Sequence, residues 1–471
     1  MKIFKKINSL PSSVKASTAF FLASLITKGI AYFTTPIYTR LLEPELFGKV
    51  SIFLTWLNVF GIIAMFSLMN GVFNNGMVDY PDDRDNYSFS MLILSNCITI
   101  ITFIVVLLSF PFINQFIDLD FKYIVLMFAV FIFQPAYSFW SARQRYELKY
   151  KANFVWAVIN ALISPLVAIL LIKYTNLNRL DARIFGAECA LLVVYIVFYF
   201  YLGAKNKYKI DTRYWKSAFL FNLPLIPHYL SALLLGSADK IMISKIINDS
   251  ATAYYSVAYS VASFASVVWT AINASLIPFT YEKCKNEQYE DISKATIPII
   301  TLFAVCCTGV IMLAPEIVSL MATSDYKEAI YVIPPVVGGV FFQVQYYIYA
   351  NVVYYYKKPI YVMIASVVST VLNIGLNFYF INKYGYIAAG YTTIICYMIQ
   401  AIIDYFAMKK VVGKSIYNMK YIVILSVVVI IISLLSNLIY DKFIIRYIIL
   451  FAMALICFIK RDLIKKVLKF R

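Results

Sequence analysis

The stretch YIVILSVVVIIISLLSNLI (residues 421–439) contains no charged side chain and consists almost entirely of Ile, Leu, Val and Ser. A helix that crosses a bilayer needs about 20 mostly apolar residues, which is the length of this stretch. A helix that is apolar on all sides belongs in a large core or in a membrane. The stretch therefore predicts a transmembrane helix.

Similar apolar segments recur along the whole chain, and with this one they number fourteen. They lie at 17–38, 47–70, 88–110, 122–140, 152–173, 184–204, 220–243, 253–277, 294–314, 329–350, 359–381, 386–407, 418–439 and 443–460. The composition agrees, because 62% of the residues are hydrophobic and 14% are charged, whereas soluble domains are about half apolar and a quarter charged. The sequence predicts an all-α integral membrane protein with about fourteen transmembrane helices.

The net charge of +18 would suggest nucleic acid as the partner of a soluble protein. Here the basic residues flank the apolar segments and concentrate in alternate loops, at 143–151, 205–216 and 409–420, and in the tail 460–471. Basic loops stay in the cytoplasm. We therefore expect both termini to be cytoplasmic and expect no nucleic acid partner.

The segments between the predicted spans are short, with none longer than about 20 residues. No soluble catalytic domain fits in them. The chain has no phosphate-binding GxxxxGK[ST] loop, no HExxH, no GxSxG and no Gly-rich dinucleotide motif. Its seven cysteines show no CxxC spacing. The sequence predicts a protein that is not an enzyme and holds no metal or cofactor.

An internal repeat divides the chain. RLLEPELFGKVS (40–51) and KIINDSATAYYS (245–256) each begin with a basic residue and two aliphatic residues, pass through a polar turn and end on Ser. Six spans separate the two copies, so both run in the same direction, as in transporters built from parallel repeats. We predict lobes at 1–205 and 206–410, followed at 411–471 by two extra helices and a basic cytoplasmic tail.

The first predicted span carries one cationic stripe. Ser24, Lys28 and Thr35 fall on one helical face. A charge in a membrane is costly and usually faces protein or water, so the stripe is a candidate cavity lining. The alternative is a structural ion pair between Lys28 and Glu188 of the sixth span. Glu188 is also a candidate for ion coupling.

The seventh span holds the second group of candidates. The spacing places His228, Ser231 and Asp239 on one face, with Lys240 about a quarter-turn away. His228, the only histidine, either packs or contacts the substrate. Asp239 either is neutralised by its neighbours or binds a cation or proton that drives transport.

Uncharged polar residues also lie inside the predicted spans. We expect most of them to join helices and some to line a sugar-compatible cavity: Asn58, Gln134, Asn160, Asn273, Gln343, Gln345, Asn373 and Asn377. Asp404, near the inner end of its span, is expected to reach the interface with water.

Three pieces of the sequence resemble the Wzx-type polysaccharide flippases of the multidrug/oligosaccharidyl-lipid/polysaccharide (MOP) exporter superfamily. They are PIYTRLLEPELFG (36–48), LPLIPHYLS (223–231) followed by Asp239 and Lys240, and YIAAGYTT (386–393) leading to Asp404 and Tyr405. One departure is the turn Asn248-Asp249-Ser250, which replaces a Gly-Pro-like turn.

The resemblance implies two six-helix lobes in a MATE-like V around a central cavity, in a bacterial inner membrane. It implies that an oligosaccharide on a polyprenyl pyrophosphate moves from the cytoplasmic to the outer leaflet by alternating access, for O-antigen or capsule. An ion gradient or the membrane potential would drive it, with a polymerase and assembly proteins as further partners.

On this reading Lys28, and secondarily Lys240, contact the pyrophosphate, while Ser24, Thr35, His228 and Ser231 line the cavity. Three alternatives remain open. A MATE-like drug antiporter would favour acidic cavity residues where this chain has Lys28. A membrane polysaccharide polymerase would need a larger outer loop. A lipid II flippase would differ only in its substrate.

Overall fold

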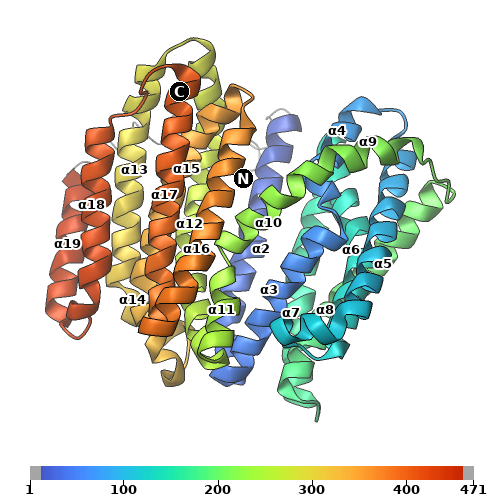
Figure 1. Cartoon of the computed structure of the whole chain (residues 1–471), viewed down its shortest axis with the longest axis horizontal. Helices are drawn as coiled ribbons and strands as arrows, with labels where there is room; N and C mark the ends of the chain where they lie inside the picture. Colours follow the sequence, from blue (N-terminus) through green and yellow to red (C-terminus); the bar gives the residue numbers. More distant parts are fainter. Residues whose placement is uncertain (1–11, 148, 460–471) are drawn as a thin grey trace, which may run out of the picture. The chain divides into compact units, whose positions relative to one another are not determined.

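A computed structural model describes residues 12–147 and 149–459. These residues form helices and no strand (Figure 1). The helices are α2 (Ser12–Leu41), α3 (Pro44–Ala64), η1 (Leu68–Asn70), α4 (Val72–Asp79), α5 (Arg84–Ile117), α6 (Phe121–Tyr146), α7 (Tyr150–Tyr174), α8 (Arg179–Lys205), α9 (Arg213–Asn222), η2 (Leu223–Leu225), α10 (Ile226–Leu235), α11 (Ala238–Ile246), α12 (Asp249–Lys285), α13 (Tyr289–Met312), α14 (Ala314–Met321), η3 (Ser324–Tyr331), α15 (Ile333–Tyr355), α16 (Pro359–Tyr384), α17 (Ile387–Val412), α18 (Met419–Leu435), η4 (Ser436–Ile439) and α19 (Phe443–Ile459).

Each of the fourteen predicted spans coincides with helix, so the all-α membrane fold is confirmed. Among the described residues, 12 helices are long and apolar enough to cross a bilayer. Among these 12, Arg213–Leu235 counts as one span and α2 is not included. Phe443–Leu455 of α19 is apolar but shorter. The count of fourteen is therefore approximate. The basic tail 460–471 lies outside the described residues.

Two predicted spans are interrupted. The span predicted at 47–70 ends at Ala64, because Phe66 and Ser67 adopt left-handed backbone angles, with φ of 54° and 43°. The span predicted at 220–243 breaks into α9, η2, α10 and α11. Pro224 and Pro227 supply no backbone N–H for a continuous α-helix there.

The chain divides into two compact units. Unit 1 consists of Met1–Leu42 and Lys49–Leu233, and unit 2 consists of Glu43–Gly48 and Leu234–Arg471. The lobe boundaries predicted at 205/206 and 410/411 stay predictions, since the compact units divide the chain at another point.

An aromatic core and a polar network hold unit 1 together. Phe73 stacks on Phe139 with 4.3 Å between ring centroids. Asp85 in the first turn of α5 pairs with Arg143 and, at 3.0 Å, with Lys205. Asn222 at the end of α9 is buried and donates from Nδ2 to the Phe66 carbonyl oxygen over 2.6 Å. This bond fixes the interrupted end of α3.

In unit 2, α15 is buried over most of its length and packs against α12, α13, α17 and α18 (Figure 1). The C-terminal helices join this core. Gln345 donates to Ser426 of α18 over 2.8 Å. Arg446 of α19 binds both carboxylate oxygens of Glu316 at 2.7 Å, and this pairing holds the pKa of Glu316 below its usual value. The helices after residue 410 are thus part of unit 2.

The two repeat copies have the same local form, a helix end, a two-residue turn and the start of a long helix. α2 ends at Leu41 and α3 begins at Pro44, while α11 ends at Ile246 and α12 begins at Asp249. Within unit 2, Gly48 lies directly against the start of α12. A methyl carbon added at Gly48 would lie 1.9 Å from the carbonyl oxygen of Asp249.

We predict that Gly48→Ala lowers the stability of the protein. The methyl group would meet backbone that cannot rotate away, and such overpacking costs about 1–3 kcal/mol. The measurement is the thermal unfolding midpoint in detergent. Gly309→Ala in α13 is the matched control, because nothing lies within 4 Å of its added carbon. Equal midpoints for the two variants would contradict the predicted packing.

Candidate functional site

Asp239 of unit 2 is a fully buried acid, with 0% of its surface exposed. It lies in the first turn of α11, where free backbone N–H groups favour a negative charge. Three donors from three helices hold its carboxylate. Tyr255 Oη of α12 donates to Oδ2, Asn377 Nδ2 of α16 donates to Oδ1 over 2.6 Å, and Thr393 Oγ1 of α17 donates to Oδ2 over 2.8 Å.

A second layer orients these donors. Asn377 Nδ2 also donates to Asn373 Oδ1 over 3.2 Å, and its own Oδ1 accepts a bond from the Thr392 hydroxyl. Asn373 Nδ2 reaches Thr393 Oγ1 at 3.5 Å. All of these side chains are buried. We call Asp239, Tyr255, Asn373, Asn377 and Thr393 the acid cage.

The donors of the acid cage are all neutral. Lys240 follows Asp239 in sequence but forms no ion pair with it, and its Nζ lies 5.6 Å from the centroid of the Tyr259 ring. Burying a carboxylate is costly unless it is paired or binds a proton or a cation. The cage brings together carboxylate, hydroxyl and amide oxygens. Such oxygens can accept a proton's hydrogen bond or coordinate a small cation.

The predicted cationic stripe lies on α2 in unit 1. Lys28 and Ser24 are exposed and Thr35 is partly buried. α2 packs on α7, where Tyr38 Oη donates to the Pro165 carbonyl oxygen over 3.3 Å. Lys28 forms no ion pair with a described residue. The alternative pairing with Glu188 is therefore not seen.

Glu188 of α8 is 6% exposed and lies within unit 1. Its helix packs on α6 and α7. Arg183 of the same helix lies over the Tyr38 ring at 4.1 Å and forms no ion pair with Glu188 in the described part of the chain. Glu188 is thus a second enclosed acid, apart from the acid cage.

The prediction that His228, Ser231 and Asp239 share one helical face is wrong. It assumed a continuous helix, whereas α10 ends at Leu235 and α11 begins at Ala238. His228 and Ser231 belong to unit 1 and are partly buried, while Asp239 enters the core of unit 2. The expected interfacial position of Asp404 is also wrong, because Asp404 is 0% exposed.

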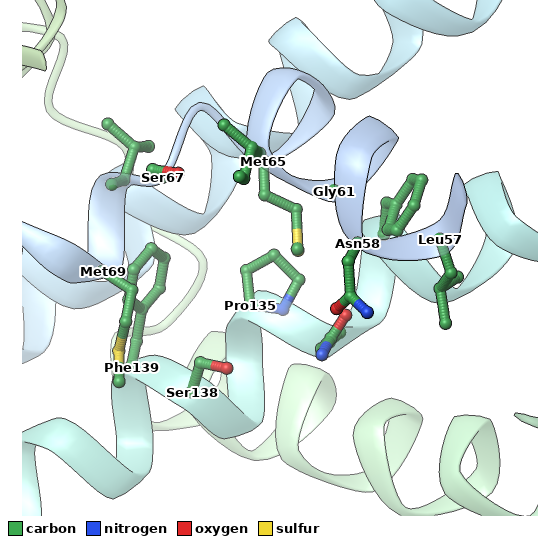
Figure 2. A pocket seen from close by; sticks show the side chains of 13 residues that line it. Leu57, Asn58, Gly61, Met65, Ser67, Met69, Pro135, Ser138 and Phe139 are labelled. Atoms are coloured by element: carbon green, nitrogen blue, oxygen red, sulfur yellow. The ribbon is translucent and has the colours of Figure 1, made fainter. Parts of the chain in front are cut away.

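A pocket of about 240 Å³ opens in unit 1 between α3, η1 and α6 (Figure 2). Asn58 of α3 and Gln134 and Ser138 of α6 are among its polar lining residues. Figure 2 shows Met65, directly after α3, pointing across the pocket toward Pro135 of α6. The pocket thus combines amides and a hydroxyl with apolar walls.

Unit 2 has a pocket of about 330 Å³ between α12 and α15. Asn273 and Gln343 line it, and Trp269 and Tyr347 form an aromatic wall with 6.5 Å between ring centroids. In the predicted repeat these are the second and fourth helices of their half, as α3 and α6 are of theirs. An amide-lined pocket thus lies between corresponding helices in each unit.

Sequence reasoning missed most of the acid cage. Tyr255 and Thr393 had no assigned role, and Asn373 and Asn377 were expected to join helices. The available signal was the pair of asparagines four residues apart, which places both amides on one face of α16. The acid that Asn377 binds, Asp239, lies 138 residues away in the sequence.

A model of the family described as "Polysaccharide biosynthesis protein" matches residues 13–282, which is more than half of the chain. The chain belongs to this family. Residues 224–379 of this polysaccharide biosynthesis protein also match the MatE family model. Lsg locus putative protein 1 of Haemophilus influenzae is 22% identical over 371 residues, which are 76% of this chain and 88% of that protein.

Solved structures share the fold of this family member. The lipid II flippase MurJ, in an inward closed conformation, superposes with a TM-score of 0.66 at 18% identity, covering 94% of this chain and 99% of that one. An inward-facing multidrug resistance MATE family transporter of the MOP superfamily gives 0.62 at 15% identity, covering 82% and 95%. At these identities the likeness shows the fold.

These findings confirm the predicted resemblance to the MOP superfamily. The solved structures that share the fold of this chain are those of a flippase and a transporter, in agreement with the prediction of a protein that is not an enzyme. The chain is a multi-span helical membrane protein, and the cytoplasmic position of both termini stays a prediction.

We predict that Asn377→Ala destabilises unit 2. It leaves a buried carboxylate with one donor fewer, and an unsatisfied buried group costs about 1–3 kcal/mol. Asn382→Ala is the control on the same helix, because Asn382 is exposed and bonds only within α16. Its effect should stay within about 0.5 kcal/mol. Unfolding midpoints in detergent measure both, and a larger loss for Asn382→Ala would contradict the cage.

Proposed function

We propose that this protein is a flippase for a polyprenyl-pyrophosphate-linked oligosaccharide, which it moves from the cytoplasmic to the outer leaflet for O-antigen or capsule synthesis. The observation that carries the proposal is Lys28, an exposed cation on the apolar helix α2 that forms no ion pair with any described residue, in a member of the polysaccharide biosynthesis protein family. A cation there is costly in lipid and favourable where an anionic group must pass.

The pyrophosphate is the part of the substrate that needs a cation. A diphosphate cannot cross hydrocarbon unless protein groups replace the water that hydrates it. A fixed ammonium group replaces part of that water. Lys28 is the first candidate because its side chain is exposed. Lys240 is the second, since it is partly buried beside Tyr259. Ser24, Thr35, His228 and Ser231 are the accompanying polar groups.

The oligosaccharide needs hydrogen-bonding groups and flat apolar surfaces. The α3–α6 pocket offers the amides of Asn58 and Gln134. The α12–α15 pocket offers those of Asn273 and Gln343 beside Trp269. Amides both donate and accept hydrogen bonds, as sugar hydroxyls do. These pockets support a sugar ligand more than a purely apolar one.

The driving force enters through a buried acid. Asp239 is held only by neutral donors in the acid cage, so a proton or a small cation has a large electrostatic effect there. Glu188 is the second candidate. Binding at such a group favours the conformation that encloses the ion, and transport is coupled if the substrate favours the other one. We propose an ion gradient or the membrane potential as the energy source.

The alternatives fit less well. A cation-exporting drug antiporter is disfavoured by the exposed Lys28 on α2. A polysaccharide polymerase is disfavoured by the short connections, which leave no room for a catalytic domain. Interaction with a polymerase or with assembly proteins would follow from the proposed pathway.

We predict that Lys28→Glu lowers surface polysaccharide by about tenfold or more while the protein stays in the membrane. Reversing the charge replaces attraction for the diphosphate with repulsion, and each ~1.4 kcal/mol of lost binding is tenfold. Polysaccharide is measured by immunoblot and protein by membrane fractionation. Lys173→Glu, an exposed lysine at the end of α7, is the control and should retain export. Normal polysaccharide in Lys28→Glu would exclude Lys28 from the site.

We predict that Asp239→Asn uncouples transport from the ion gradient. The amide keeps the size of the carboxylate but cannot bind a proton or carry the charge that attracts a cation. Purified variant in proteoliposomes should lose gradient-driven movement of lipid-linked oligosaccharide and retain binding of it. If an imposed gradient still accelerates movement as in the unmodified protein, Asp239 is not the coupling group.

A further inference from the structure

A polar face runs along α16 beneath the membrane-facing side chains. Ser366, Ser369, Thr370, Asn373 and Asn377 recur at helical spacing, and all are between 0% and 4% exposed. Asn373 and Asn377 belong to the acid cage. The remaining three extend the polar face away from the cage toward the start of α16.

A matching polar face runs along α17. Thr393, Tyr397, Gln400 and Asp404 are spaced by four, three and four residues and are 1%, 6%, 3% and 0% exposed. This spacing places them on one side of the helix. With a rise of about 1.5 Å per residue, the face extends about 16 Å from Thr393 to Asp404.

The two polar faces meet. α16 and α17 pack together along their length (Figure 1), and they run antiparallel because a turn of two residues joins them. The hydrogen bond between Thr392 and Asn377 sets the register. In that register helical spacing brings Ser369 opposite Gln400, and Ser366 opposite Asp404. We call this buried contact between α16 and α17 the polar seam.

Several polar atoms of the seam lack partners in the described structure. They are Ser369 Oγ, Gln400 Oε1 and both carboxylate oxygens of Asp404. Buried polar groups nearly always have a partner, so a run of such atoms on one contact needs an explanation. Protons and small polar molecules that move along the seam would provide one.

Within residues 12–147 and 149–459, Asp404 forms no ion pair. α17 packs on α15 and α16, and the one charged side chain on those two helices is Lys383, at the opposite end of α16. Tyrosines lie near this end of α17: Tyr349 of α15 packs on Tyr405 at 5.6 Å and on Tyr417 at 5.4 Å. The ring of Tyr361 of α16 lies 5.3 Å from Nζ of Lys410, an exposed lysine in the last turn of α17. An isolated buried carboxylate in such surroundings takes up a proton.

We propose that Asp404 is a proton-binding site and that the polar seam conducts protons between Asp404 and Asp239. The inference rests on the proposed role of Asp239 as the coupling group, and it identifies the coupling ion as a proton. Asp404 lies at the end of α17 that is predicted to be cytoplasmic, whereas the acid cage lies about 16 Å further along the helix.

The transfer needs no other reactant than water. The Asp404 carboxylic acid releases its proton and becomes a carboxylate, and Asp239 gains one and becomes neutral. Between them each seam hydroxyl accepts a proton on its oxygen as it gives up its own, so no atom is gained or lost. The Gln400 amide donates one hydrogen bond and accepts another, and so orients the neighbouring hydroxyl groups of the seam. Water bridges two seam groups where they lie further apart than hydrogen-bond length.

The seam also touches the α12–α15 pocket. Tyr397, within the polar face of α17, accepts a bond from Gln343 over 3.2 Å, and Gln343 lines that pocket. A ligand that takes over the Gln343 amide would therefore change the hydrogen bonding of the seam. Substrate and proton can influence one another through this single contact.

Proton uptake into proteoliposomes tests the proposal without any substrate. The purified full chain is reconstituted with an internal pH-sensitive dye, and a potassium diffusion potential, negative inside, drives protons inward. Uptake should fall by about tenfold or more in Asp404→Asn and in Gln400→Leu, since positioned proton-transfer groups contribute about 10²–10⁴-fold. Gln345→Leu is the matched control, a buried glutamine on α15 outside the seam, and should retain uptake.

Infrared spectroscopy tests the protonation itself. At neutral pH the protein should show a carboxylic-acid C=O band, and Asp404→Asn should lack one component of it. An unchanged band, unchanged uptake in both seam variants, or an equal loss in Gln345→Leu would each overturn the proposal. If Asp404→Asn fails to fold, proton uptake is measured with Gln400→Leu and Ser369→Ala instead, and both should be slow.

These outcomes are separate from those of the proposed function. Loss of polysaccharide in Lys28→Glu together with normal proton uptake in the seam variants would leave the flippase intact and reject the seam. Slow uptake in the seam variants together with normal polysaccharide in Lys28→Glu would support the seam and reject the proposed role of Lys28 in the flippase.

Discussion

The carboxylate of Asp239 constrains the arrangement of unit 2. Its oxygens accept bonds from α12, α16 and α17, so three helices must meet at one point around a side chain of α11. A bilayer offers no water to satisfy such a group, and the protein must supply every partner itself. The rest of the polar interior, including Asn373 and Thr392, follows from that requirement, because each donor to the acid must in turn be oriented.

The two units place their charges differently. In unit 1 the side chain of Lys28 is exposed on α2 and pairs with no acid in the part of the chain that the structure describes, whereas in unit 2 the acid Asp239 is enclosed. An exposed cation can meet a large anionic ligand that comes and goes. An enclosed acid can exchange only something as small as a proton or a metal ion. The division of work between substrate and driving ion that we propose rests on this difference in access.

The amide-lined pockets show what the internal repeat contributes. α3 and α6 form one with Asn58 and Gln134, and α12 and α15 form the other with Asn273 and Gln343. Corresponding helices of a repeated chain face each other in the same way, so a gap in one half has a counterpart in the other. Their aromatic linings differ, because Phe131 and Phe139 line the pocket of unit 1 whereas Trp269 and Tyr347 line that of unit 2.

The sequence by itself determined the membrane spans, the repeat and the candidates Lys28 and Asp239, because uncharged runs of about 20 residues and charges inside them are local features. It did not reveal the break between α10 and α11, which separates His228 from Asp239, since a break depends on which neighbours satisfy the freed backbone. It also did not reveal the acid cage or the burial of Asp404. Those depend on residues far apart in the chain, and only packing brings Tyr255, Asn377 and Thr393 to one carboxylate.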